Sequence, residues 1–239
     1  MTKSTFLTAN WRYLAMLNYT IEPDILRPFV PTGTELDQWN GHTFVSVVGF
    51  LFLNTRLVGL PIPFHQNFEE VNLRFYVRRR GATGWRRGVV FIKELVPKPA
   101  IAAVARLVYN ENYQALPMRH TLERRSTGVI MAAYGWQVNG QWNRLEVTTA
   151  GAAHPIADGS EEEFIAEHYW GYAAQKNGGC VEYQVEHPRW RIWQVQHSRL
   201  QCNVAALYGP QFANSLSARP SSAFLAEGSA VTVRQGTKL

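Results

Sequence analysis

The residue with the clearest potential for covalent chemistry is a lysine between two prolines, Lys98 in the stretch VPKPA (residues 96–100). Pro99 suits the first position of a helix, because its missing N–H would have no partner inside the helix. Lys98 then falls at the N-cap, where an ammonium cannot accept hydrogen bonds from helical N–H groups and meets the positive end of the helix dipole. Both effects favour the neutral amine, which can attack a carbonyl carbon to give a Schiff base. We therefore nominate Lys98 as an imine-forming nucleophile, with an exposed loop lysine as the alternative.

A second group of candidates lies on a predicted strand over residues 68–78. Successive side chains of a strand alternate between its faces, so Glu70, Asn72 and Arg74 share one face. A carboxylate, an amide and a guanidinium at alternate positions are typical of a strand that lines a polar cavity or faces solvent. In a cavity, Glu70 would act as an acid/base or electrostatic partner, Arg74 would anchor a carboxylate, and Asn72 would contact the substrate.

The predicted strand before Lys98 carries two further charges, Lys93 and Glu94. Alternation places Lys93 on one face with Phe91 and Leu95, and Glu94 on the other face, which is also apolar. At least one of these charges should therefore border a buried or cavity-facing surface. Lys93 is our candidate for a substrate-binding cation there, and an exposed strand end is the alternative.

Signatures of metal, nucleotide and serine-hydrolase chemistry are missing from the sequence. None of its seven histidines is paired at i, i+3 or i, i+4, and there is no HExxH, GxSxG, Walker or GxGxxG motif. The two cysteines, Cys180 and Cys202, lack CxxC spacing and are interpreted as reduced core residues. We expect neither a metal nor a cofactor.

Mostly β-strands must position the candidate side chains. Alternating apolar and polar residues, with β-branched and aromatic enrichment, predict strands near residues 11–19, 42–53, 68–78, 88–96, 119–124, 127–138, 141–149, 180–186, 190–202 and 223–234. Asn139-Gly140 is typical of a two-residue hairpin turn. The pattern indicates an antiparallel sandwich or barrel and does not separate the two.

Helices are few in this pattern. One short helix is predicted over residues 22–29, and a longer one over 158–172, where Ser160 and Glu163 have capping-box spacing. A third begins at Pro99 and has an apolar stripe at helical spacing, formed by Ile101, Val104, Ala105 and Val108.

The composition fits one domain over residues 1–239, with 46% hydrophobic and 18% charged residues and no linker or repeat that divides it. The N-terminal apolar stretch is interrupted by Arg12 and has no cleavage pattern, and no apolar run reaches the length of a membrane span. We expect a cytoplasmic protein that does not contact a membrane.

The net charge of +6 is concentrated in a predicted hairpin tip, VRRRGATGWRRG (77–88). A solvated basic turn that discourages edge aggregation is the simpler interpretation, and attraction of an anionic partner is the alternative. No zinc-finger, helix-turn-helix or RNP signature accompanies the basic residues, so we expect no nucleic-acid partner.

Several stretches together resemble the landmarks of a known family. In chain order they are LRPFVPTGTELDQWNGHTFVSVVGFLF, FEEVNLRFYV, ALPMRH, EHYWGY, VEHPRWRIW and AEGSAVTV. Over nearly its whole length the chain resembles the YqjF-like family of uncharacterised conserved proteins (domain of unknown function 2071), which looks related to acetoacetate decarboxylase. The resemblance implies a mostly antiparallel, cone-shaped β-barrel with a few peripheral helices and a cavity inside.

The resemblance to acetoacetate decarboxylase also implies roles for two residues. In that enzyme one lysine follows a proline and forms the Schiff base, and the next residue, a second lysine, lowers its pKa. Here Lys98 occupies the first place but Pro99 the second, so an auxiliary cation would have to come from Lys93 or an arginine. The decarboxylase's cavity glutamate, in an aromatic-x-Glu context, is matched by Glu70.

Three functions remain open at this point. The first is a decarboxylase-like enzyme that acts on a small carbonyl or carboxylate compound through Lys98. The second is a cavity that binds a small organic molecule without reaction. The third is an interaction scaffold that uses the basic hairpin. A small organic molecule is the expected partner, and the sequence leaves a homo-oligomer open.

Overall fold

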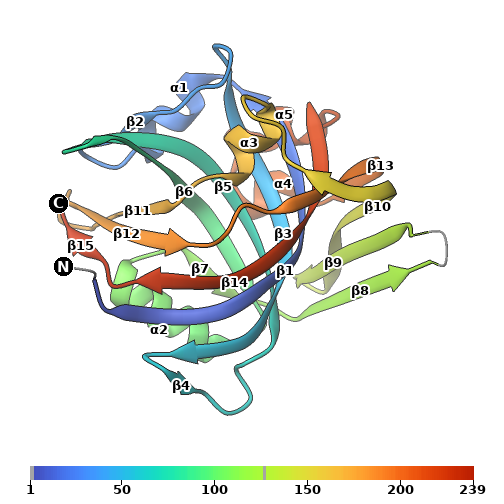
Figure 1. Cartoon of the computed structure of the whole chain (residues 1–239), viewed down its shortest axis with the longest axis horizontal. Helices are drawn as coiled ribbons and strands as arrows, with labels where there is room; N and C mark the ends of the chain where they lie inside the picture. Colours follow the sequence, from blue (N-terminus) through green and yellow to red (C-terminus); the bar gives the residue numbers. More distant parts are fainter. Residues whose placement is uncertain (1–2, 126–127) are drawn as a thin grey trace.

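The computed structural model describes residues 3–125 and 128–239, and most of these residues lie in strands. In chain order the strands are β1 (Thr5–Ile21), β2 (Glu35–Leu36), β3 (Thr43–Leu57), β4 (Leu60–Pro61), β5 (Phe68–Gly81), β6 (Gly84–Val96), β7 (Tyr113–Ala115), β8 (Met118–Arg124), β9 (Ile130–Val138), β10 (Gln141–Pro155), β11 (Trp170–Ala174), β12 (Cys180–Glu186), β13 (Arg191–Gln201), β14 (Ser222–Arg234) and β15 (Thr237–Lys238) (Figure 1). Each of the ten predicted strand ranges overlaps an observed strand, although the range 127–138 begins at a residue outside the described part of the chain.

The helices are short and lie around the sheet. They are α1 (Pro23–Leu26), α2 (Pro99–Tyr109), α3 (Glu161–Ala166), α4 (Val204–Leu207) and α5 (Ala213–Ser217), with single 3-10 turns η1 (Arg27–Phe29) and η2 (Pro210–Phe212). Helix α2 begins as predicted, with Lys98 at its N-cap and Pro99 as its first residue. Of its predicted apolar stripe, Val108 falls outside the described side chains.

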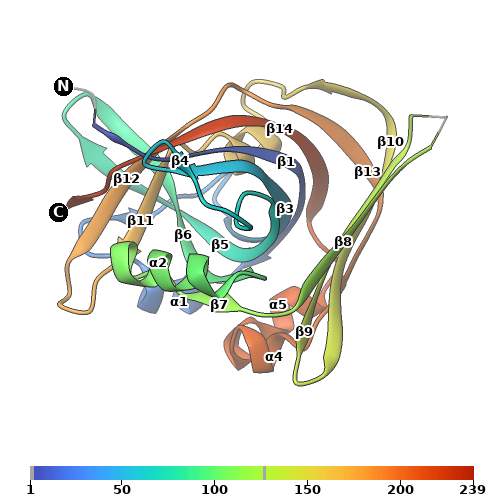
Figure 2. The same cartoon turned by 90° about the horizontal axis from the view of Figure 1, so that it is seen from below.

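Seven strands of the sheet close into a ring. Their order is β12-β11-β6-β5-β3-β1-β14, and β14 pairs with β12 through Val185↔Val233 and Glu186↔Thr232. Only the pairing of β11 with β6 is parallel within this ring. Strands β13, β10, β9 and β8 continue from β14 as a separate part of the sheet, seen at the right of Figure 2. This mostly antiparallel arrangement confirms the β-rich fold that the resemblance implied.

Both faces of the ring strands are buried, which explains their apolar composition. On β3, Phe50 and Phe52 belong to an apolar cluster inside the ring, whereas Val47 belongs to a second cluster on the outside. Strand β9 packs so closely on this outer face that a Cβ on Gly49 would lie 2.6 Å from Cδ2 of Tyr134. Gly49 therefore permits the contact between β3 and β9.

The helix predicted over residues 158–172 is wrong in its second half. The cap is confirmed, because the backbone N–H of Glu163 donates to Ser160 Oγ at 3.2 Å, but the helix ends at Ala166. Residues 170–174 instead form β11, which pairs with β6 and β12. Pairing with two strands of the ring overrides the local helical pattern, as tertiary contacts commonly do.

A bulge in β6 changes which side chains share a face. Lys93 and Phe91 are paired with consecutive residues of β5, so Ile92 is an extra residue between them. An inserted residue resets the alternation of a strand. The predicted shared face of Phe91 and Lys93 is therefore wrong, and Phe91 lies on the same side as Glu94.

Candidate functional site

The ring encloses a cavity of about 180 Å³. Every one of the seven ring strands contributes to its lining, and helix α2 supplies a further wall through Ala100, Ile101, Val104 and Ala105. Much of the wall is apolar and aromatic, formed by side chains that include Trp11, Phe50, Phe52, Phe68 and Phe91. Such walls with a few convergent polar groups are typical of small-molecule sites.

The three polar residues predicted to share a face of β5 all line this cavity. Glu70, Asn72 and Arg74 are buried and point inward at alternate positions, as the period of a strand requires. Asn72 Nδ2 donates a hydrogen bond to Glu70 Oε1 at 2.9 Å. The structure therefore brings together the carboxyl, amide and guanidinium groups that alternation placed on one face.

The cavity runs from an accessible end to a closed end along β5. Ile62 and His65, from the loop that precedes β5, line the accessible end, where Ile62 is 37% exposed. Arg74 is only 8% exposed, and its Nη2 donates to the backbone oxygen of Ile165 in α3 at 3.1 Å. Figure 1 shows β4 near the bottom of the molecule and α3 in its upper half, which matches this direction.

Three carboxyl groups converge on the cavity beside two tyrosines. Tyr113 OH donates to Glu70 Oε2 at 3.1 Å, and Tyr183 OH donates to Glu111 Oε1 at 2.5 Å. Glu94 lies directly opposite a cavity residue of β5 and is 1% exposed. Glu111 lies two residues before Tyr113, the first residue of β7, and Tyr183 lies on β12. No single predicted strand grouped them, so sequence reasoning did not find them.

Burial makes these carboxyl groups hard to ionise. It raises the pKa of Glu70 to about 7, although the hydrogen bonds from Asn72 and Tyr113 oppose the shift. It also raises the pKa of Glu111 to about 7. The pKa of Glu94 lies well above its usual value because of burial, followed by the nearby charges of Glu111 and Glu70. The cavity thus holds carboxyl groups that change protonation close to neutral pH.

Arg74 is a buried cation without an ion-pair partner among the described residues. Besides the bond to α3, its Nη2 lies 3.8 Å from Met16 Sδ, and its Nε has no hydrogen-bond partner there. Its guanidinium carbon lies 5.7 Å from the centre of the Tyr76 ring. An uncompensated buried charge is costly, so this group favours an anionic ligand.

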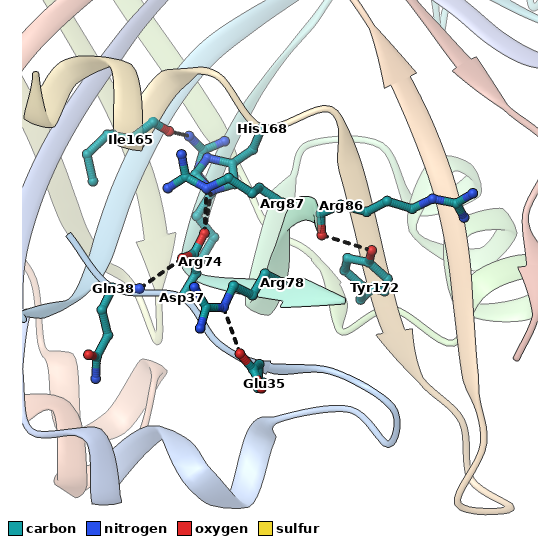
Figure 3. A network of polar contacts seen from close by, with 10 residues as sticks. All are labelled: Glu35, Asp37, Gln38, Arg74, Arg78, Arg86, Arg87, Ile165, His168 and Tyr172. Atoms are coloured by element: carbon teal, nitrogen blue, oxygen red, sulfur yellow. Dashed lines mark hydrogen bonds and ion pairs between the residues drawn. The ribbon is translucent and has the colours of Figure 1, made fainter. Parts of the chain in front are cut away.

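His168 lines the same cavity next to a buried aspartate. Its Nε2 lies 4.0 Å from Oδ2 of Asp37, which accepts a hydrogen bond from Arg87 Nε at 2.6 Å (Figure 3). Burial lowers the pKa of His168 well below its usual value, and the charges of Arg87 and Arg74 add to the effect. The imidazole is therefore neutral at physiological pH, and sequence reasoning had given His168 no role.

The two candidate lysines lie apart from this group. None of the described residues that line the cavity is a lysine. Lys98 is half-buried at the start of α2, two residues before the wall begins. The bulge in β6 turns Lys93 away, and its Nζ donates to the backbone oxygen of Leu207 at 2.6 Å. Burial lowers the pKa of Lys93.

The predicted basic hairpin is formed by the ends of β5 and β6, and most of its charge is compensated. Four of its five arginines make ion pairs within the described residues: Arg78 with Glu35, Arg79 and Arg86 with Glu182, and Arg87 with Asp37. The fifth, Arg80, lies 5.2 Å from the centre of the Trp85 ring. Because Arg79 and Arg86 share Glu182, three carboxylates face five arginines, and the interaction hypothesis stays a prediction.

The described part of the chain also bears on membrane spans and metal sites. No helix there is long and apolar enough to cross a bilayer. Within the same residues, no group of three or more histidine, cysteine, aspartate and glutamate side chains is placed to hold a metal ion. The cavity itself holds a fixed cation beside carboxyl groups that can give or take a proton.

Residues 8–230 match the DUF2071 family, described as "Uncharacterized conserved protein". The uncharacterized protein YqjF of Bacillus subtilis (strain 168) is 37% identical over 75 residues, which is 31% of this chain and 31% of that protein. The match thus spans about a third of the length of this curated relative.

Solved structures share the fold at low sequence identity. Acetoacetate decarboxylase from Legionella pneumophila subsp. pneumophila str. Philadelphia 1 gives a TM-score of 0.69 at 13% identity, over 98% of this chain and 87% of that chain. An acetoacetate decarboxylase-like enzyme from Sphingomonas wittichii RW1 gives 0.68 at 13% identity, over 98% and 92%. The enduracididine biosynthesis enzyme MppR complexed with pyruvate gives 0.67 at 13% identity, over 100% and 91%. These likenesses show the acetoacetate decarboxylase-like fold.

Proposed function

Because this chain belongs to the DUF2071 family of uncharacterised conserved proteins, whose description names no activity, we propose its function from the chemistry of the cavity. The cavity binds a small organic compound that carries a carboxylate and a carbonyl group. Glu70 then takes a proton from the bound compound or gives one to it, so the protein is an enzyme of the acid–base type.

The observation that carries this proposal is a buried guanidinium beside a carboxyl group that changes protonation near neutral pH. Arg74 Nε has no hydrogen-bond partner in the described residues, although the group lines the cavity. A ligand carboxylate would supply both the missing acceptor and the missing negative charge. The anionic end of the ligand would therefore lie at the closed end of the cavity.

Glu70 has the properties of a proton-transfer group. A general acid or base works best when its pKa is close to the working pH, and the pKa of Glu70 is raised to about 7. Its hydrogen bonds to Asn72 and Tyr113 fix the orientation of the carboxyl group beside the cavity. The aromatic walls lower the local dielectric constant, which strengthens the electrostatic effects of these groups.

The structural relatives support the same class of compound by analogy of fold. One of them, MppR, was solved with pyruvate, which carries a carboxylate next to a carbonyl group. Fold analogy alone does not transfer function. In this chain it is the side chains of Arg74 and Glu70 that favour such a compound.

Binding without reaction is the second candidate, and the largely apolar cavity wall favours it. The two candidates differ in whether the bound compound exchanges hydrogen with solvent. An enzyme of the proposed type catalyses exchange of the hydrogens next to the carbonyl group, and a simple binding protein does not.

A panel of 2-keto acids and matched uncharged ketones tests the proposal. We expect the keto acids to bind, as measured by calorimetry, and their C3 hydrogens to exchange in D₂O, as measured by NMR. Arg74→Met should weaken keto-acid binding about tenfold to a hundredfold, because it removes charged hydrogen bonds. The uncharged ketones make no ion pair with Arg74, so they should bind the wild type and Arg74→Met with similar affinity.

Arg74→Lys is the matched control, since it keeps the charge but loses the planar fork. It should bind keto acids between the wild type and Arg74→Met. If Arg74→Met binds keto acids as tightly as the wild type, the anchor is wrong. If no member of the panel binds the wild type, the proposed function is wrong.

A further inference from the structure

We propose, building on the function proposed above, that Glu94 is a second catalytic group. It acts as a neutral carboxylic acid that protonates the substrate's carbonyl oxygen while Glu70 removes a proton from the neighbouring carbon. The pair would convert a ketone into its enol without an imine.

The position of Glu94 is the first support. Glu94 pairs directly with Asn72 across β5 and β6, and Asn72 in turn hydrogen bonds Glu70. Opposite residues on neighbouring strands have Cβ atoms roughly 5 Å apart, so all three side chains meet at one place on the wall. The bulge at Ile92 is what brings Glu94 to this side.

An unsatisfied atom is the second support. Glu94 is 1% exposed, yet its Oε2 has no hydrogen-bond partner in the described residues. Buried polar atoms are nearly always paired, so an unpaired one in a cavity wall requires an explanation. A carbonyl oxygen of a bound substrate would accept the hydrogen bond that a protonated Glu94 offers there.

Burial, followed by the neighbouring carboxyl groups, favours the protonated form of Glu94 by raising its pKa. The titratable groups that act on Glu94 are Glu111 before β7, Glu70 of β5 and Tyr113 of β7, whose hydrogen bond opposes the rise in its pKa. The same cavity is also lined by Arg74, His65, His168 and Tyr183. Burial and the two neighbouring carboxyl groups raise the pKa of Glu94 well above its usual value. Neighbouring carboxyl groups in a dry site do not ionise together, so one serves as acid and the other as base.

The proposed step balances without any further reactant. The Glu70 carboxylate takes a proton from the carbon next to the carbonyl group, and the C–H electron pair becomes the new C=C bond. The carbonyl π pair moves to oxygen, which takes the proton of Glu94. The products are an enol, a protonated Glu70 and an ionised Glu94, so the total charge is unchanged.

This assignment also accounts for a cavity wall without a lysine among its described residues. Enzymes that form a Schiff base use the cationic imine to accept electrons from the breaking bond. A neutral acid at the carbonyl oxygen stabilises the same developing charge by direct proton donation.

The pH dependence of hydrogen exchange tests the assignment on the full-length protein with a 2-keto acid. The rate should rise with pH as Glu70 ionises around pH 7 and fall at higher pH as Glu94 loses its proton. Glu94→Gln should lower the rate about tenfold to a hundredfold and remove the alkaline fall, because an amide does not ionise in this pH range. Glu94→Leu should lower the rate further.

Glu111→Gln is the control within the same acidic cluster. The carboxyl group of Glu111 raises the pKa of both Glu94 and Glu70, so its removal should move both limbs of the profile to lower pH. Calorimetric binding of the keto acid shows that each variant is folded.

The outcomes separate the two proposals. A Glu94→Gln variant that keeps both the wild-type rate and the alkaline fall overturns the role of Glu94 and leaves the proposed function standing. Binding by the wild type without any exchange overturns catalysis by both glutamates. Absence of binding overturns the proposed function itself, and the role of Glu94 with it.

Discussion

At the scale of single residues, the buried carboxyl groups of the cavity lower the free energy of unfolding when they ionise, so their effect on stability depends on pH. The pKa of Glu70 rises from its usual 4.5 to about 7 on folding, mainly because of burial. Between pH 4.5 and about pH 7, the Glu70 carboxyl group therefore keeps its proton in the folded protein but loses it in the unfolded chain. The contribution of Glu70 to stability is greatest below pH 4.5 and is lost as the pH rises to about 7.

This sign gives a prediction for Glu70→Gln, which keeps the shape of the side chain but does not ionise. As the pH rises from 4.5 to 8, the free energy of unfolding of the variant, compared with that of the wild type, should increase by up to about 3 kcal/mol. Urea unfolding of both proteins at the two pH values measures the change. Glu123→Gln, on an exposed strand, is the control. An equal change in both variants would contradict the prediction.

Lys98 supplies a second prediction at this scale. Because it lies outside the described lining of the cavity, we expect no covalent adduct on it when the protein is mixed with keto acids and borohydride. Peptide mass spectrometry, with Lys98→Ala as control, gives the answer. An adduct that the substitution abolishes would instead support the imine mechanism that the sequence suggested.

Single residues on one strand were the predictable part of the candidate site. Glu70, Asn72 and Arg74 follow the two-residue period of β5, so one strand sufficed to group them. Alternation predicted that Lys93 or Glu94 borders a buried or cavity-facing surface, and Lys93 was the candidate for the substrate. The bulge, which alternation does not reveal, places Glu94 in the cavity wall instead. Tyr183 could not be found, since only the closed ring brings it near the others.

At the scale of elements, packing between strands sets limits that a sequence pattern does not reveal. The outer face of β3 meets β9 at Gly49, where an added Cβ would lie 2.6 Å from Cδ2 of Tyr134. The ring of Tyr134 is buried, and its hydroxyl donates to the backbone oxygen of Tyr13 at 2.7 Å. It therefore has little room to move away.

We accordingly predict that Gly49→Ala destabilises the fold by about 1–3 kcal/mol, the usual cost of overpacking. Gly135→Ala is the matched control, because its Cβ would approach Arg119 Cγ at 3.3 Å, in a long and flexible side chain. Urea unfolding should show a clearly smaller loss for the control. Equal losses would mean that the contact between β3 and β9 is not the cause.

At the scale of the whole molecule, the strand content was predictable but the closure of the ring was not. Alternation located most of the ten main strands because they bury an apolar face, whereas β8 is exposed along nearly its whole length. Closure depends on two residue pairs between β12 and β14, and no local pattern specifies them. The resemblance to acetoacetate decarboxylase, rather than periodicity, supplied that expectation.

Strand β1 lies between β3 and β14, which are far apart along the chain, and this separation affects how the protein folds during synthesis. Strand β1 pairs with β3 on one side and with β14 on the other, so that Thr5 lies opposite Arg234. During synthesis one edge of β1 stays unpaired until β14 has left the ribosome. Pairings over such separations make folding slow and leave strand edges exposed meanwhile. A nascent chain that ends after β12 already contains Glu70, Glu94 and Glu111, but without β14 its ring is open and encloses no cavity. We expect chaperones to bind its exposed strand edges.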